Sequence, residues 1–251
     1  MDFADLILAV AAGLAGGAMN ALAGGGTFAT LPALLALGLP ANIANATSNF
    51  ALLPGAAASA WTFRDELSPI AKVAIPLLAA ITFAGGLVGS LLLVLTPTET
   101  FDVLIPWLTL YAFVVLAFGR RAATWLHARV TIGRRTLMAA QSLLGIYGGY
   151  FGGGVGLMTT ATYGLLANVS PRDMFAARTL MLAVANFAAA IVFVAFAMVA
   201  WDRCLPVLAG ALAGGWLAAR LGKGLSPALV RGGTLAITAA TTIVFFVRAY
   251  G

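Results

Sequence analysis

Apolar segments long enough to cross a lipid bilayer recur along the whole chain. The hydrocarbon core of a bilayer is about 30 Å thick, a distance that a helix of about 20 apolar residues spans. Such segments lie at residues 42–62, 70–95, 101–118, 174–200, 204–222 and 228–248. Only 9% of the residues are charged, against about 25% in soluble domains, which is too little to cover a globular surface in water. The sequence therefore predicts an all-α polytopic membrane protein without a separate soluble domain.

Two further apolar regions are each interrupted by a cluster of glycines. In the first half of the chain an apolar segment at 6–23 runs into Gly24–Gly26. In the second half an apolar segment at 136–151 runs into the glycines at 152–154 and 156. Each cluster is followed by a short apolar piece of about a dozen residues, which is too short to cross the membrane alone.

The polar stretch that follows each break also recurs. Residues Leu39–Ser48 align with Ser170–Thr179, so both halves present their elements in the same order. The chain therefore predicts a first membrane repeat at 1–118, a basic connector at 119–135 and a second membrane repeat at 136–251. Internal repeats of this kind are typical of secondary transporters.

Counting positive residues favours one of two topologies. If each broken region crosses the membrane once, nine Lys and Arg residues lie on one side and four on the other. If each is a re-entrant hairpin, only Arg203 and Arg248 lie opposite eleven others, with Arg178 inside a span and left out. The eleven are Arg64, Lys72, Arg120, Arg121, Arg129, Arg134, Arg135, Arg172, Arg220, Lys223 and Arg231. Because cytoplasmic loops are rich in Lys and Arg, we expect two inverted repeats, each a hairpin plus three transmembrane helices, with a cytoplasmic connector and both termini outside.

The breaks predict an anion site made largely of backbone. A helix that restarts near the middle of the membrane has free N–H groups, and unpaired ones are costly in lipid. The start of a helix also carries the positive end of its dipole, which favours an anion. The candidate positions are Gly25, Gly26 and Thr27 in the first half and Gly153, Gly154 and Gly156 in the second.

Polar side chains after the first break fit the same site. Asn45 and Asn49 are four residues apart and so share one helix face, while Thr47 and Ser48 add hydroxyl donors. Hydrogen bonding between helices is the alternative interpretation for Asn45, Thr47 and Ser48. Two glycine pairs elsewhere, Gly85 with Gly89 and Gly210 with Gly214, are expected to serve close helix packing.

Arg178 and Thr179 take the equivalent place in the second half, with Asn186 on a similar face. An arginine inside a membrane span is costly, and we interpret Arg178 as a residue that binds or shapes the site for the substrate. The alternative is that Arg178, close to the start of its span, extends to the cytoplasmic headgroups.

The sequence offers no sign of an enzyme or of a cofactor. It contains no phosphate-binding loop for ATP, no zinc-protease motif and no nucleophile elbow. Cys204 is the only cysteine and His127 the only histidine, so no Cys/His metal site is expected. The net charge of +6 is explained by the cytoplasmic loops, so no nucleic acid partner is expected. All eight acidic residues fall in loops or at span ends, which argues against a buried carboxylate relay for protons.

Two motifs resemble those of a known transporter family. Gly24–Thr27, followed by Leu31–Leu35 and Asn45–Ser48, looks like the first signature of the TauE/SafE sulfite exporter family. Tyr147–Gly156 with Ala177–Thr179 resembles the second signature. The resemblance covers nearly the whole chain. It departs from the family pattern at Arg178, where a small polar residue is expected.

The resemblance implies export of sulfite or of C2 organosulfonates such as sulfoacetate across the inner (plasma) membrane of a prokaryote. The partners expected are then a small anionic substrate and the lipid bilayer, with a homodimer left open. Import of sulfate or another oxyanion remains an alternative, because the sequence does not distinguish import from export. The alternative from another class is a membrane scaffold module without transport.

Overall fold

The computed structural model describes residues 1–127, 133–167, 169, 173–221 and 226–251. Within these residues the chain forms ten α-helices, one 3-10 turn and no β-strand, which confirms the predicted all-α fold. The helices are α1 (Phe3–Leu22), α2 (Thr27–Ala36), α3 (Ala41–Thr62), α4 (Ile75–Leu95), α5 (Thr98–His127), α6 (Arg134–Tyr150), α7 (Val155–Ala167), α8 (Phe175–Ala195), α9 (Trp201–Leu221) and α10 (Pro227–Tyr250).

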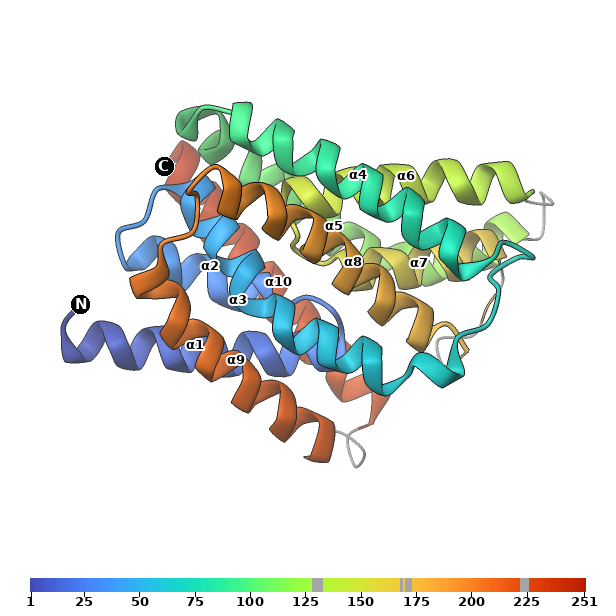
Figure 1. Ribbon diagram of the computed structural model, residues 1–251, viewed down its shortest axis with the longest axis horizontal. Coiled ribbons are helices and arrows are strands. Elements are labelled where there is room, and N and C mark those ends of the chain that lie inside the picture. The colour runs from blue at the N-terminus through green and yellow to red at the C-terminus, as the bar shows by residue number, and fades with distance from the viewer. Residues whose placement is uncertain (128–132, 168, 170–172, 222–225) are drawn as a thin grey trace.

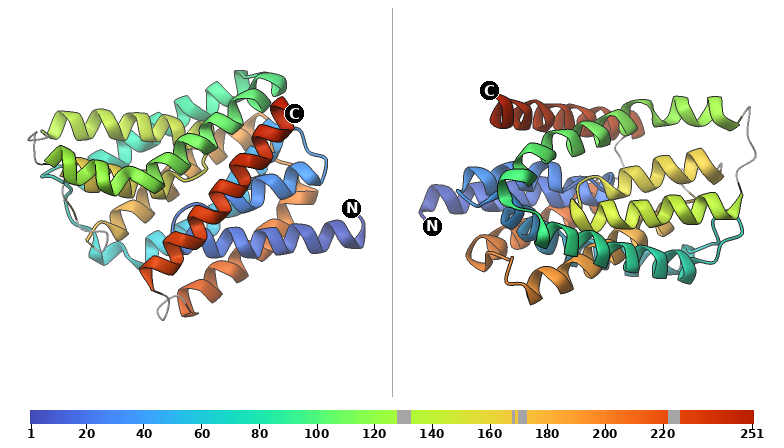
Figure 2. Two further views of the ribbon diagram at one scale, coloured as in Figure 1. Left: turned by 180° about the vertical axis from the view of Figure 1, so that it is seen from behind. Right: turned by 90° about the horizontal axis from the view of Figure 1, so that it is seen from above.

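The long helices run between two ends of a bundle (Figure 1). Both chain termini lie at one end, which we call the termini end. Helix α5 ends and α6 begins at the opposite end, which we call the connector end (Figure 2). The two termini therefore share a side of the molecule, as the charge distribution predicts.

Both predicted glycine breaks interrupt a helix. Helix α1 ends at Leu22 and α2 begins at Thr27, while α6 ends at Tyr150 and α7 begins at Val155. Figure 1 shows α2 running back toward the termini end, where α1 starts, and α7 running back toward the connector end, where α6 starts. Two hairpins thus enter the bundle from opposite ends, in agreement with the hairpin topology. That the two halves are inverted copies of each other stays a prediction.

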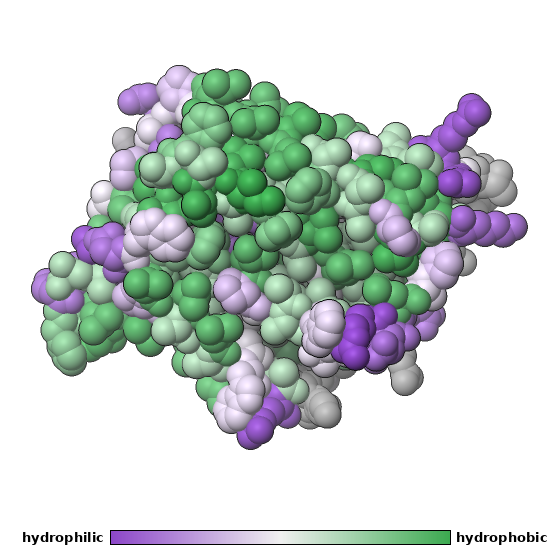
Figure 3. Space-filling view, in the orientation of Figure 1, coloured by the Kyte–Doolittle hydropathy of each residue, from purple (hydrophilic) through white to green (hydrophobic). Residues whose placement is uncertain are grey.

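The surface has the polarity of a membrane protein. Apolar residues cover the middle of the face shown in Figure 3, and polar residues gather toward its ends. By length and composition, α1, α4 and α8 could cross a membrane, as could Thr98–Gly119 of α5 and Ala228–Tyr250 of α10. Helix α3 is similarly long but carries the buried polar cluster 45–49.

Three element boundaries differ from the sequence-based ranges by five residues or more, and one of them is the end of α8, which lies at Ala195 instead of residue 200. Helix α4 begins at Ile75 instead of residue 70, because Ala71 and Lys72 adopt φ of 48° and 63° in a tight turn between Ile70 and Val73. This left-handed conformation is incompatible with a right-handed helix. Helix α5 continues to His127, so the first part of the connector at 119–135 is helical. Several predicted cytoplasmic cations lie outside the described residues or side chains: Arg120, Arg121, Arg129, Arg172 and Lys223.

Glycines bring two helix pairs into backbone contact. A Cβ added to Gly89 of α4 would lie 2.0 Å from a backbone oxygen of α6, and Gly85 is packed against the same helix. A Cβ added to Gly214 of α9 would lie 1.9 Å from a backbone oxygen of α1, and one added to Gly210 would also meet the backbone of α1. The predicted packing role of these four glycines is confirmed. The first helix of each half therefore packs against the fourth helix of the other half.

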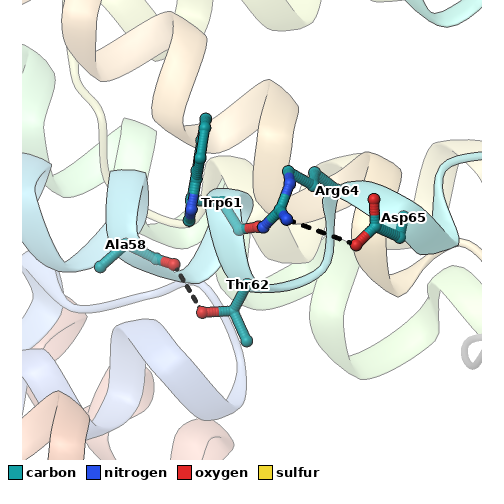
Figure 4. A network of polar contacts seen from close by, with 5 residues as sticks. All are labelled: Ala58, Trp61, Thr62, Arg64 and Asp65. Carbon is teal, nitrogen blue, oxygen red and sulfur yellow. Dashed lines mark hydrogen bonds and ion pairs between the residues drawn. The ribbon is translucent and has the colours of Figure 1, made fainter.

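Two arginines stack on tryptophans near the ends of α3 and α9. Arg64 lies 4.6 Å from the centroid of the Trp61 ring and 3.6 Å from a carboxylate oxygen of Asp65 (Figure 4). Arg220 stacks on Trp216 in the last turns of α9 at 3.9 Å. Because tryptophan is enriched at membrane–water interfaces, we expect these pairs to lie near the lipid headgroups.

Candidate functional site

The two glycine breaks touch in the interior of the bundle. A Cβ on Gly24 would lie 2.7 Å from the Gly156 Cα, and one on Gly156 would lie 2.8 Å from the Gly24 Cα. Gly24, Gly152 and Gly154 have φ of 81°, 70° and 77°, a region that L side chains rarely adopt. A Cβ on Gly154 would also lie 3.0 Å from the Phe28 ring. Glycine is therefore required both for the shape of the breaks and for their contact.

Both short helices begin here with unused hydrogen-bond donors. In α2 the Phe28 N–H donates to Gly25 O at 3.2 Å. Among the described residues no partner is found for the N–H of Thr27, nor for those of Gly156 and Leu157 in α7. Free N–H groups and the helix dipole together favour an anion at such a place. All six predicted backbone positions lie in or beside the breaks: Gly25, Gly26, Thr27, Gly153, Gly154 and Gly156.

Two asparagines of α3 reach across to the second break. The Asn45 side-chain amide donates to Tyr150 O at 3.1 Å, and that of Asn49 donates to the Asn186 Oδ1 of α8 at 3.3 Å. A Cβ on Gly152 would lie 2.9 Å from the Asn49 Nδ2. Both asparagines are buried, and the Oδ1 of each has no hydrogen-bond partner in the part of the chain described. The structure thus brings Asn45 and Asn49 of the first half to the break of the second.

The hydroxyl residues predicted for the site hydrogen-bond elsewhere. Thr47 Oγ1 accepts from the Ala200 N–H at 3.1 Å, which ties α3 to the start of α9. The Ser48 hydroxyl pairs with that of Thr30 on α2. Thr179 donates to a carbonyl of its own helix at 2.8 Å. Thr47 and Ser48 make helix–helix hydrogen bonds, and Ser48 holds α2 in place beside the break.

Arg178 lies away from the contact between the breaks. It is the fourth residue of α8, which starts at the connector end. Asn186 follows eight residues later, and a helix rises about 1.5 Å per residue, so the two are about 12 Å apart along the axis. The guanidinium carbon lies 4.5 Å from the centroid of the Phe175 ring, and the residue is only 8% exposed. The arginine is therefore buried between the centre and the connector end.

Three residues that shape the centre were not among the substrate-binding residues predicted from the sequence, although Asn186 and Tyr147 were noted there. Asn186 receives the Asn49 hydrogen bond, and Tyr147 donates its hydroxyl to Gly153 O at 2.9 Å, which fixes the second break. Thr241 of α10 donates to Phe28 O at 2.8 Å. A signal existed for Asn186, because it is the only Asn or Gln from residue 174 onward.

Thr241 compensates for a proline in α2. In a regular helix Phe28 O would accept from the N–H of residue 32, but Pro32 has none. The Thr241 hydroxyl takes its place, so the last helix of the chain satisfies the carbonyl that Pro32 leaves free. The sequence shows that a proline leaves the carbonyl four residues earlier without its helical partner. It does not show which residue on another helix replaces that partner.

We expect Thr241→Val to lower the free energy of unfolding by about 1–3 kcal/mol, because Phe28 O is then buried without a partner. Thr242→Val is the matched control, since Thr242 donates to Thr238 O in its own helix. Denaturation in mixed micelles followed by circular dichroism measures both. Equal losses of unfolding free energy in the two variants would show that the Thr241 bond to α2 stabilises the protein no more than the Thr242 bond within its own helix.

No acidic side chain is buried in the centre. All eight Asp and Glu residues lie within the described residues, at helix ends or between helices, and none is buried. No group of three or more His, Cys, Asp or Glu residues that could hold a metal ion occurs in the described part of the chain. The centre therefore offers N–H and amide donors to an anion without a carboxylate to repel it.

Comparison with known proteins gives one family. A family model described as "Sulfite exporter TauE/SafE" matches residues 9–245. A probable membrane transporter protein of Haemophilus influenzae is 26% identical over 235 residues, covering 92% of this chain and 91% of that protein. The probable membrane transporter protein YfcA of Escherichia coli K12 is 24% identical over 86% of this chain and 80% of its own length.

A third relative matches over a shorter region. The probable membrane transporter protein ORF9 of Sinorhizobium is 30% identical over 168 residues, which span 63% of this chain and 62% of that protein. No solved structure matches the chain.

Proposed function

The chain belongs to the TauE/SafE sulfite exporter family and is therefore a membrane transporter, and we propose that it exports small sulfur-containing anions. The substrates are sulfite or C2 organosulfonates such as sulfoacetate, which pass through the central site between the two halves. The observation that carries the proposal is the contact of Gly24 with Gly156, where two helix starts meet. A transporter of this type is not an enzyme, and no cofactor enters the proposal.

The donors at the centre match the chemistry of such substrates. Sulfite and sulfonate groups present several oxygen acceptors, which the free N–H groups of Thr27, Gly156 and Leu157 can satisfy. Asn45 and Asn49 each donate one amide N–H within the protein, and the second N–H of each amide can donate to a ligand. This assignment of substrate-binding residues rests on the arrangement of donors around the breaks.

We place the connector end in the cytoplasm and the protein in the inner membrane. Arg134 and Arg135 begin α6 at the connector end and are exposed. The two arginines of the opposite end are paired with acids, Arg203 with Asp202 and Arg248 with Asp102. The pairing of each half's first helix with the other half's fourth supports the proposal that the halves are inverted copies.

Export of an anion needs no proton relay. A membrane potential, negative inside, drives an anion outward by about 2.3 kcal/mol per charge per 100 mV. We therefore propose that export runs on the membrane potential alone. The absence of buried carboxylates among the described residues supports this hypothesis.

The test is efflux from proteoliposomes loaded with sulfite or sulfoacetate, with the potential set by a potassium gradient and valinomycin. We expect saturable efflux that accelerates when the interior is negative, with protein-free liposomes as the control. Efflux that ignores the imposed potential would refute potential-driven export. Uptake of external sulfate without efflux of sulfite would favour the import alternative, and no flux of any anion would contradict transport of this class.

Asn49→Asp is expected to reduce efflux by at least about tenfold, because a buried carboxylate beside Gly152 repels an anion, and tenfold corresponds to only 1.4 kcal/mol. The matched control is Asn42→Asp in the same helix. The Asn42 Oδ1 accepts from the Ile43 N–H and the Thr98 hydroxyl, roles that a carboxylate keeps. Unchanged efflux in Asn49→Asp would remove Asn49 from the substrate site.

A further inference from the structure

Arg178 is a buried cation that the fold does not neutralise. It is 8% exposed, and no ion pair joins it to a carboxylate among the described residues. Its Nε has no hydrogen-bond partner there either. Stacking on Phe175 offsets part of the cost of burial, but a buried charge without a counter-ion is strongly destabilising. An anion bound beside Arg178 would therefore offset the cost of burying its charge.

Two hydroxyls on the neighbouring helix α7 are also left without partners. Thr159 and Tyr163 are 0% exposed, and neither hydroxyl has a hydrogen-bond partner in the described part of the chain. They are four residues apart, on one face of α7. The Tyr163 ring belongs to the same buried cluster as Met174, which caps α8, and Ala177, which precedes Arg178 in that helix.

These three side chains lie between the central site and the connector end. At about 1.5 Å per residue, Thr159 is about 6 Å and Tyr163 about 12 Å from the start of α7 at the breaks. Arg178 is displaced from Asn186 in the same direction, since α7 ends and α8 begins at the connector end. By contrast, the hydroxyls of Thr47 and Ser48, nearer the termini end, have partners.

We propose that Arg178, Tyr163 and Thr159 form a second anion-binding site, the α7–α8 site, in series with the central one. It takes an oxyanion or a sulfonate, because a guanidinium fork matches two oxygens of such a group and the hydroxyls donate to others. The α7–α8 site contacts the substrate between the central site and the connector end, and this role rests on the proposed function. The binding step itself is independent of whether the chain transports.

The experiment measures anion binding to the purified full-length protein in nanodiscs by isothermal titration calorimetry, with sulfite, inorganic sulfate and sulfoacetate as probes. The variants are Arg178→Gln, Arg178→Lys, Tyr163→Phe and Thr159→Val, of which the last two preserve side-chain shape. Arg64→Gln is the matched control, because Arg64 also stacks on an aromatic ring at the connector end but is exposed.

We expect two binding events in the wild type. Arg178→Gln should remove one of them, Arg178→Lys should weaken it less, and Tyr163→Phe should weaken it by about tenfold, as for a hydrogen bond to a charged group. Arg64→Gln should leave both events unchanged. Melting temperatures without ligand report whether each variant is folded, so a structural effect is separated from a loss of binding.

Two outcomes overturn the α7–α8 site: a single binding event in the wild type, or affinities within twofold of wild type in folded Tyr163→Phe and Thr159→Val. The proposed function fails separately. If the wild type binds two anions but shows no flux in proteoliposomes, transport of these substrates is wrong while the α7–α8 site stands.

Discussion

Alanine at Gly24 is expected to lower the free energy of unfolding by about 2–5 kcal/mol and to abolish transport. Two costs add: a left-handed conformation costs an L residue about 1–2 kcal/mol, and overpacking costs about 1–3 kcal/mol. The φ of Gly24 is 81°, and the new Cβ would lie 2.7 Å from the Gly156 Cα. Because the neighbour is backbone and not a flexible side chain, α2 and α7 have to move apart.

Gly38→Ala separates the two costs. Gly38 has nearly the same φ, 82°, but nothing lies within 4 Å of an added Cβ. It should therefore lose only about 1–2 kcal/mol and keep transport. Unfolding in mixed micelles and efflux from proteoliposomes measure both variants. If Gly24→Ala matched Gly38→Ala in both assays, the contact of the breaks would not matter for function.

Alanine at Gly214 is expected to destabilise the protein by about 3 kcal/mol, although alanine is the better helix former. The added Cβ would lie 1.9 Å from Leu14 O and 2.7 Å from the Leu14 Cα. Membrane helices associate through close packing of small residues, without a hydrophobic driving force between them. Separating α1 from α9 therefore disrupts one of the two glycine-packed helix pairs that join the halves.

Gly233→Ala in α10 should stabilise the protein instead of destabilising it. No atom lies within 4 Å of a Cβ at Gly233, so the gain in helix propensity, up to about 1 kcal/mol, remains. Opposite shifts in melting temperature for these two substitutions would confirm the packing argument. A stabilising effect of Gly214→Ala would contradict it.

Helix order and both breaks could be predicted because their signals are local. The length of an apolar segment and a run of glycines each act within a few turns of chain, as at Gly24–Gly26. The start of α4 was predicted five residues too early, at residue 70 instead of Ile75. Ala71 and Lys72 adopt a left-handed turn without glycine, so the sequence carried no sign of it.

The partners of the polar residues were harder to predict because they depend on how helices pack. Asn45 and Thr47 are two residues apart in α3, which turns them about 200° from each other around the helix. Asn45 meets the second break, while Thr47 meets the start of α9. Choosing between these faces requires knowing which helices lie on each side of α3.

Arg178 shows the limit of aligning the two halves. The alignment places it opposite Thr47, which suggests the centre, but it lies in the first turn of α8, where Phe175 covers it. Its burial without a carboxylate partner depends on the positions of acids from other segments, which the sequence does not reveal. The unpartnered hydroxyls of Thr159 and Tyr163 were missed for the same reason.

The pairing of α1 with α9 and of α4 with α6 restricts any alternating-access motion of this molecule. The two glycine interfaces are in backbone contact, so a change that preserves them moves α1 and α9 together as one rigid body and α4 and α6 as another. Each body then contains helices from both halves of the chain. The repeat predicted from the sequence is thus different from the unit that can rock as a whole.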